Sequence, residues 1–149
     1  MIAPDPNLMQ LALQTAKNHQ TPFGAVIAMG DQPFVSAANL VSSTCDPTAH
    51  AAMVAIRQMA EHLQKSDLSG YHLYTTCEPC PMCMGAAIWA NLDAVIYGCS
   101  IDDTREMVPQ INLSAETIAA KSFREIRVVG GILMEDCMEL IRESRSGKS

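Results

Sequence analysis

The feature that most constrains this chain is a pair of cysteines separated by two residues, Cys80 and Cys83, with His50 thirty residues before the first of them. Two thiolates and one imidazole make a three-ligand zinc site with an open fourth position, which is typical of a catalytic zinc. A water in that position is acidified by the metal and becomes a nucleophile near neutral pH. The spacing therefore predicts one Zn²⁺ per chain. A structural zinc with Cys77 as a fourth ligand is the alternative, which the tight C-E-P-C spacing disfavours.

The order of these ligands resembles the signature of the zinc-dependent cytidine and deoxycytidylate deaminase superfamily, in which H-x-E is followed by P-C-x-x-C. Pro79 completes the second half of the signature, but Ala52 stands where the family has glutamate. The resemblance implies that this glutamate is the catalytic proton shuttle, and an alanine cannot carry a proton. The resemblance therefore implies the scaffold of a zinc hydrolase that releases ammonia from a ring amino group.

Two explanations fit Ala52. Either the substitution was made in an active deaminase so that substrate persists in its site, or the chain is a natural pseudo-deaminase that serves as a partner or binding module. The rest of the motif is intact, and a decaying site would lose more than one carboxylate, so we favour the first. Loss of a general acid or base lowers rates by typically ~10²–10⁴. We therefore expect zinc and substrate binding with little or no turnover.

The apolar pattern predicts an α/β fold in a single domain over residues 1–149, with the tail at about 144–149 frayed. Helical spacing predicts helices over 6–19, 49–64, 82–90, 114–121 and 132–143. Alternating or continuous apolar runs predict strands over 23–29, 33–38, 71–76, 94–99 and 125–129. Thr48 and Ser114 are the expected caps of their helices. The resemblance covers residues 8–142 and implies the cytidine-deaminase-like three-layer sandwich, a five-stranded mixed sheet with helices on both faces.

The resemblance also implies residues that contact the substrate. Asn39 lies eleven residues before His50, at the offset of the asparagine with which these deaminases hold the base or sugar, although an asparagine at a strand end is usually a turn residue. Phe23 is a candidate aromatic wall for the base, against the default of a core phenylalanine. Ala51, next to the ligand histidine, is a further candidate for the pocket.

Two acidic residues complete the candidate site. Glu78 lies in the ligand loop, and we expect it to support catalysis from there. Asp103 belongs to a polar segment that follows the fourth predicted strand, and we expect it to bind an amino-substituted ring. The alternative for Asp103 is that of most exposed loop acids, which are only solvated.

Two branches of the family compete for the substrate. Residues 21–27 and 46–50 resemble guanine and nucleoside deaminases, while 46–50 and 129–133 also resemble bacterial tRNA adenosine deaminases. The formal net charge of −6 and the lack of a dense Lys/Arg run in the last helix argue against an RNA surface. We therefore predict a free purine-like nucleobase or nucleoside, guanine first, with tRNA as the disfavoured alternative.

Partners and location follow from general features. The chain has no apolar run as long as a membrane span and no start that resembles a signal peptide. Six cysteines without a secretory signal indicate metal ligands and buried thiols, so we expect a cytoplasmic protein without a membrane partner. The resemblance implies a homodimer, because helices around the active site contribute to the interface in this family.

Overall fold

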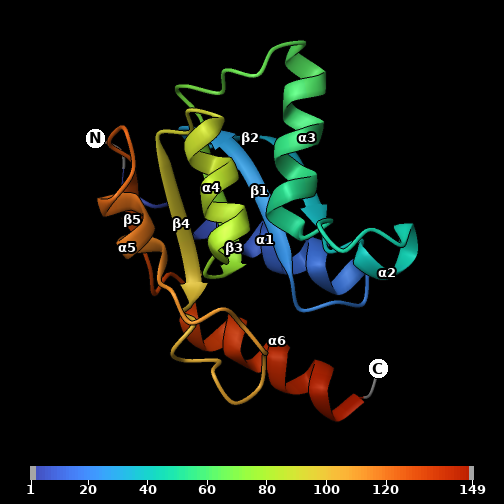
Figure 1. Ribbon diagram of the computed structural model, residues 1–149. Coiled ribbons are helices and arrows are strands. Elements are labelled where there is room, and N and C mark those ends of the chain that lie inside the picture. The colour runs from blue at the N-terminus through green and yellow to red at the C-terminus, as the bar shows by residue number, and fades with distance from the viewer. Residues whose placement is uncertain (1–2, 148–149) are drawn as a thin grey trace.

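The computed structural model describes residues 3–147, which form a mixed sheet between two layers of helices (Figure 1). The strand order is β2-β1-β3-β4-β5, and β1 to β5 span Gly24–Met29, Gln32–Ala38, His72–Cys77, Ala94–Cys99 and Arg127–Val129. β1 is antiparallel to β2 and β3, whereas β3, β4 and β5 run parallel. The predicted α/β fold with five strands in a mixed sheet is confirmed.

The alternation of side chains along the strands shows which helices cover each face of the sheet. Val26, Tyr74 and Ile96 are aligned across β1, β3 and β4 and belong to the core under α1 (Pro6–Asn18) and α6 (Met134–Gly147). Their neighbours Ile27, Leu73 and Val95 face the opposite way, because successive side chains on a strand alternate. They belong to the core under α3 (Ala51–Leu63), α4 (Pro81–Trp89) and α5 (Ala115–Ala120).

Several helix boundaries differ from the prediction. Thr48 does not cap α3, because its N–H and hydroxyl both donate to Asp46 Oδ1, at 2.9 and 2.8 Å. His50 is the N-cap residue instead, with no side-chain capping bond. A short helix, α2 (Val41–Thr44), lies in the segment predicted to be a loop. Ser114 caps α5 as expected, accepting from the Thr117 N–H at 3.1 Å.

The last helix also exceeds its predicted length. α6 was expected over 132–143 and runs over Met134–Gly147, so its backbone is helical in part of the segment that we expected to fray. Residues 148 and 149 lie outside the described part of the chain. Within residues 3–147 no helix combines the length and the apolar composition that crossing a bilayer requires.

The ends of three strands are joined where the functional residues lie. The Thr76 hydroxyl donates to the Pro22 carbonyl at 2.8 Å and accepts from the Gly24 N–H at 3.1 Å, which ties the end of β3 to the start of β1. The Asn39 N–H donates to the Phe23 carbonyl at 3.1 Å, which ties the end of β2 to the same point. Phe23 and Asn39 are thus held beside each other by backbone hydrogen bonds.

Candidate active site

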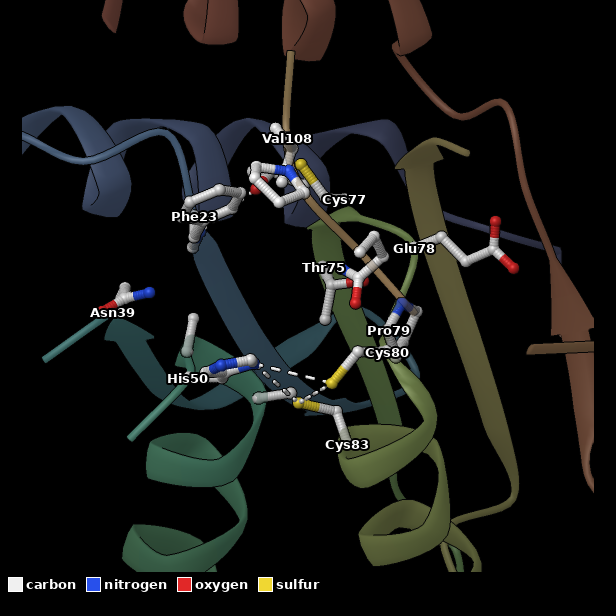
Figure 2. Close-up of a pocket in the computed structure, with 16 residues that line it drawn as sticks. Phe23, Asn39, His50, Thr75, Cys77, Glu78, Pro79, Cys80, Cys83 and Val108 are labelled. Atoms are coloured by element: carbon white, nitrogen blue, oxygen red, sulfur yellow. Dashed lines mark hydrogen bonds between the residues drawn. The ribbon is translucent and has the colours of Figure 1, made fainter. Parts of the chain in front are cut away.

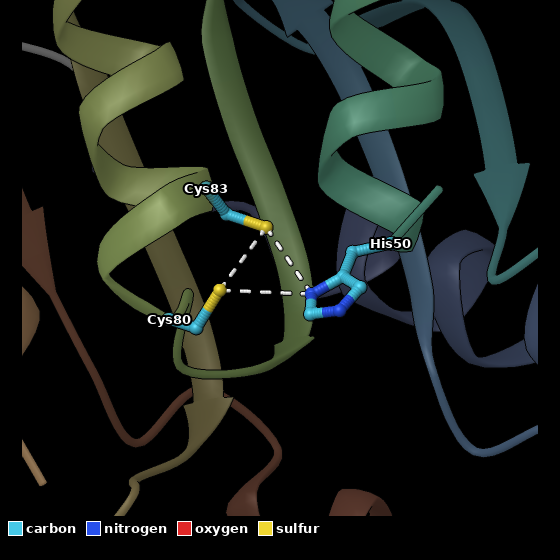
Figure 3. A group of neighbouring side chains, drawn as sticks. All are labelled: His50, Cys80 and Cys83. Carbon is cyan, nitrogen blue, oxygen red and sulfur yellow. Dashed lines mark hydrogen bonds between the residues drawn. The ribbon is translucent and has the colours of Figure 1, made fainter. Parts of the chain in front are cut away.

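Two helix starts bring the predicted metal ligands together. His50 is the N-cap residue of α3, Cys80 is the N-cap residue of α4, and Cys83 lies in the first turn of α4 behind Pro81. Proline suits that first turn because its missing N–H would have no helical partner there. His50 Nδ1, Cys80 Sγ and Cys83 Sγ lie 3.6 Å from one another in all three pairs (Figure 3).

This triangle fits a zinc ion. A tetrahedral ion at about 2.3 Å from sulfur and about 2.0–2.1 Å from nitrogen separates its ligand atoms by roughly 3.5–3.8 Å. Both thiols are buried, and His50 is half-buried. Among the described residues, His50, Cys80 and Cys83 are the group of ligand-type side chains close enough to hold a metal. Soft thiolates with one imidazole are a donor set that zinc prefers.

The electrostatics of the site favour an anionic sulfur. Hydrogen bonds from Cys83 and then from His50 lower the pKa of the Cys80 thiol to about 4. The same contact with Cys80 raises the pKa of Cys83. Both sulfurs also lie at the N-terminal end of α4, where helix N–H groups stabilise negative charge.

Cys77 does not complete the ligand set. Its sulfur lies 3.6 Å from the sulfur of Cys99, the residue paired with it on the neighbouring strand β4. Burial and the contact with Cys99 raise the pKa of Cys77 well above its usual value, the contact being the larger cause. Cys77 is not among the ligand-type side chains gathered at His50, which are Cys80 and Cys83, so the three-ligand prediction stands over the structural-zinc alternative.

A cavity of about 210 Å³ lies beside the ligand triangle, between the starts of α3 and α4 (Figure 2). Its lining includes Ala51 and Ala52 from the first turn of α3, Phe23 just before β1 and Asn39 just after β2. Ala52 is buried, with 4% of its surface exposed, and its side chain ends at Cβ. Position 52 therefore shares the cavity wall with His50 and presents no acid to it.

Asn39 has a defined orientation in this wall. Its Oδ1 accepts the Val41 N–H at 2.8 Å, which assigns the other amide atom as nitrogen. Figure 2 shows that nitrogen on the side of His50 and Phe23. The arrangement leaves Asn39 Nδ2 directed to the cavity as a donor.

The family model for the zinc-binding region of cytidine and deoxycytidylate deaminases matches residues 3–99, about two thirds of the chain, and this range contains all three ligands. The chain belongs to this deaminase family. The prediction from the H-x-A and P-C-x-x-C motifs is confirmed at the level of family, fold and zinc.

Members of two branches are similar to this deaminase-family chain. A guanine deaminase from Nitrosomonas europaea superposes with a TM-score of 0.88 and 25% identity, over 98% of this chain and 86% of that one. A guanine deaminase of Bacillus subtilis is 45% identical over 85 residues, which are 57% of this chain and 54% of that protein, so the match spans about half of the relative. A tRNA-specific adenosine deaminase of Haemophilus influenzae is 29% identical over 140 residues, 91% of this chain and 79% of that protein.

Glu78 lines the cavity from the ligand loop, but its carboxylate is turned away from the metal ligands. Glu78 is 5% exposed, and its carboxylate accepts hydrogen bonds from the N–H groups of Ile101 and Ala115, at 2.8 and 2.7 Å. Figure 2 shows the side chain directed away from His50 and Cys80. Both of its oxygens are therefore occupied by backbone donors outside the cavity, which does not suit a catalytic acid or base. Glu78 instead fastens the segment between β4 and α5 to the ligand loop.

Asp103 is also misplaced in the prediction. It is absent from the cavity lining, and its carboxylate accepts the Ser100 N–H at 2.9 Å while its own N–H donates to Ser100 Oγ at 2.9 Å. These bonds close a local turn on the surface. The default interpretation of an exposed loop acid, rather than a contact with a ring, describes Asp103.

Sequence reasoning missed two parts of the cavity wall of this family member. Residues 108–110 line the cavity from an irregular segment, where no period reveals which side chains face inward. Thr75 lines it from β3. Leu73, two residues earlier on this strand, faces the same side of the sheet because side chains alternate, so its place in the core could have indicated where Thr75 points. Thr75 Oγ1 is buried and, among the described residues, is the one buried side-chain polar atom without a hydrogen-bond partner.

Proposed function

We propose that this chain is the scaffold of a zinc-dependent hydrolytic deaminase acting on a purine-like nucleobase or nucleoside, guanine first, and that Ala52 leaves it catalytically silent. One observation carries the proposal. The three ligand atoms lie 3.6 Å apart at the edge of a cavity whose wall contains position 52. The metal site and the place for the proton-transferring residue thus occur together, and only the acid itself is absent.

The reaction needs a nucleophile and two protons placed in sequence. Water replaces the amino group on a ring carbon, one proton goes to the ring nitrogen, and another leaves with ammonia. When bound by His50, Cys80 and Cys83, zinc supplies an acidified water as the nucleophile. Asn39 Nδ2 is placed to hold the ring by donation, and Phe23 to form an apolar wall. No side chain at position 52 moves the protons, because alanine has no titratable group.

The size of the cavity supports a small substrate. A volume of about 210 Å³ lies below the ~300–1,000 Å³ of typical drug-sized sites, and it suits a single ring system. The similarity to guanine deaminases of two bacteria makes guanine the first candidate base.

A tRNA adenosine deaminase is the second candidate function, and the Haemophilus influenzae relative, matched over 91% of this chain, is the observation in its favour. The net charge of −6 opposes it, as does the cavity lining, in which no lysine or arginine occurs. A pseudo-deaminase that binds an active relative is the third possibility, and it predicts that restoring the acid gives no activity.

Ammonia release by the Ala52→Glu protein tests these alternatives. The zinc-loaded variant and the unchanged chain are assayed in parallel against free bases, nucleosides and tRNA, with metal content measured for both. We expect release from guanine or a purine nucleoside, at least ~10²–10⁴ faster than with Ala52. Release from tRNA alone would assign the protein to RNA modification. A zinc-loaded variant that is inert toward every substrate would contradict the proposal and favour a binding partner.

We also propose that the protein is a cytoplasmic homodimer. All six cysteines are free thiols, as expected for a reducing compartment. Trp89 and Phe123 are 74% and 64% exposed, and their ring centroids lie 4.8 Å apart at the border of α4 and the segment after α5. Large aromatic side chains exposed together are typical of protein interfaces. A second copy of the chain is the partner that we propose for them.

A further inference from the structure

Three cysteines outside the metal site gather where β3 and β4 end. Cys77 is the last residue of β3 and Cys99 is the last residue of β4, and the two are aligned with each other across these parallel strands. Cys137 on α6 packs against the same strand end, because its sulfur fills the space into which a side chain at Gly98 would extend. The proposed deaminase chemistry uses none of these three thiols.

The geometry of Cys77 and Cys99 suits a disulfide. Their sulfurs lie 3.6 Å apart. Neighbouring strands are about 4.7–4.9 Å apart, which is within the Cα separation of about 4.4–6.8 Å that a disulfide bridges. The two sulfurs need to approach each other by about 1.5 Å to reach bonding distance. Rotation of the side chains and a small movement of the strand ends can provide this approach while the sheet stays folded.

The three thiols differ in how a small molecule can reach them. Cys77 is partly buried and lines the cavity beside the metal ligands, whereas Cys99 and Cys137 are 0% and 1% exposed. Figure 2 shows the side chain of Cys77 directed away from the sulfurs of Cys80 and Cys83. A small oxidant in the cavity therefore reaches Cys77 first, and Cys99 lies directly behind it as a second thiol.

We propose that Cys77 and Cys99 are an oxidative modification site, at which a peroxide that enters the cavity converts the two thiols into a disulfide. The Cys77 sulfur attacks one oxygen of hydrogen peroxide, the O–O bond breaks, and the second oxygen leaves as water, so that Cys77 becomes a sulfenic acid. The Cys99 sulfur then attacks the Cys77 sulfur, and the S–O bond breaks to release a second water that takes up the Cys99 proton. The two thiols lose two electrons, which reduce the peroxide.

The environment of the pair makes this reaction slow. The contact with Cys99, followed by burial, raises the pKa of Cys77 well above its usual value, so little thiolate is present near neutral pH. Brief exposure to peroxide should leave the pair reduced, and sustained exposure should oxidise it. Disulfides that form in reducing compartments are usually transient and redox-sensing. We therefore expect a bond that thiol reductants reverse.

A bond between these two residues would enclose the metal-binding cysteines. The chain between Cys77 and Cys99 contains Cys80, Cys83 and the whole of α4. The Glu78 N–H donates to the Cys99 carbonyl at 2.8 Å, so a hydrogen bond already holds the ligand loop to the end of β4. A covalent bond beside it would restrict opening of the loop. Zinc should consequently leave the oxidised protein more slowly than the reduced one.

Peroxide treatment of the zinc-loaded protein tests the modification site. Zinc keeps Cys80 and Cys83 coordinated during the treatment, and the remaining free thiols are then alkylated. Proteolytic cleavage before Asp93 separates Cys77 from Cys99, so a disulfide appears in mass spectrometry as two linked fragments. We expect this linked species, with tandem spectra that place the bond at Cys77. Dithiothreitol should separate the fragments again.

Release of zinc to a chelator gives a second readout. We expect release from the oxidised protein to be slower by about threefold or more, because the disulfide closes the segment that carries two ligands. Reduction with dithiothreitol should return the original rate. An unchanged rate would refute the effect on the ligand loop.

A matched pair of variants locates the reaction. Cys77→Ala should remove both the linked species and the slower release, whereas Cys45→Ala, at an exposed cysteine, should keep both. Cys99→Ala is a second variant with the same expectation as Cys77→Ala, and Cys137→Ala should still form the bond. Zinc content and the circular dichroism spectrum before treatment show that each variant is folded.

The remaining outcomes would overturn the proposal. A chain that retains zinc and forms no linked species under sustained peroxide would show that the pair is not a modification site. A bond between Cys99 and Cys137 would assign the reaction to a different pair. A bond through Cys80 or Cys83, with loss of zinc, would identify the metal site as the oxidised centre. None of these measurements uses a substrate, so their failure is distinguishable from failure of the proposed deaminase function.

Discussion

Ala52 and Thr75 lie in the wall of the same cavity. Thr75 on β3 is 5% exposed and its buried hydroxyl has no hydrogen-bond partner among the described residues, although native proteins pair nearly all such groups. An acid introduced at position 52 would therefore bring acceptors into the cavity that the Thr75 hydroxyl lines.

Replacing this hydroxyl gives a prediction at the scale of one residue. Thr75→Val should be neutral or should raise the free energy of unfolding by about 1 kcal/mol, because an unpaired buried hydroxyl contributes a desolvation cost and no hydrogen bond. The neighbouring Thr76→Val is the matched control. Thr76 is also buried but makes hydrogen bonds to Pro22 and Gly24, so its loss should cost about 1–3 kcal/mol.

Urea unfolding of the two valine variants and the unchanged chain measures both changes. A Thr75→Val protein destabilised as much as Thr76→Val would show that Thr75 has a partner in solution, and the idea of an unpaired donor would then be abandoned. Repeating the pair in the Ala52→Glu background extends the test. There Thr75→Val should become destabilising if the new carboxylate accepts from the hydroxyl.

At the scale of helices and strands, the longer regular segments were predictable, whereas the short helix α2 and the irregular segment 100–113 were not. β4 was predicted with its observed bounds, 94–99, because every residue in it is buried and the apolar run is continuous. The start of α3 was predicted two residues early, since Asp46 binds Thr48 and delays the first helical residue to Ala51. The preference of threonine for helix N-caps does not reveal that a nearby carboxylate competes for its hydrogen bonds.

The segment between β4 and α5 shows why part of the candidate site could not be predicted. Residues 100–113 contain turns without periodicity, so nothing in their pattern indicated that 108–110 line the cavity. Two long-range hydrogen bonds, donated by the N–H groups of Ile101 and Ala115 to the Glu78 carboxylate, hold both ends of this segment. The metal ligands, in contrast, could be predicted from their spacing in the sequence, because few residue types bind zinc.

Removing the charge of Glu78 tests this attachment. In Glu78→Gln one oxygen becomes an NH₂ donor that faces a backbone N–H, and a hydrogen bond to a charged group is lost. We expect a cost of about 1.5–3 kcal/mol in unfolding free energy and faster hydrogen exchange at the amides of Ile101 and Ala115. Glu106→Gln, an exposed site in the same segment, should change stability by less than about 0.5 kcal/mol. Unchanged exchange at both amides in Glu78→Gln would refute the role assigned to Glu78.

At the scale of the whole molecule, the deaminase site and the proposed dimer surface belong to the same helix. α4 begins at the ligands Cys80 and Cys83 and ends at Trp89, whose side chain is 74% exposed. A shallow apolar groove of about 450 Å³ lies there between α4 and α5, lined by Ile88, Trp89, Leu113 and Phe123 among others. Burial of this surface against a second copy of the chain would stabilise the helix that carries two of the three metal ligands.

Sedimentation of a Trp89→Ala/Phe123→Ala protein tests this surface. We expect the unchanged chain to sediment as a dimer and the double variant as a monomer at the same micromolar concentration, since aromatic hot spots contribute about 2 kcal/mol or more each when buried in an interface. Phe34→Ala is the control, because Phe34 is also exposed, at 44%, but lies on β2 against Tyr71. A monomeric unchanged chain would refute the homodimer, and a double variant that remains dimeric would place the interface on another face. Because α4 carries Cys80 and Cys83, the monomeric variant should also lose zinc to a chelator faster than the Phe34→Ala control.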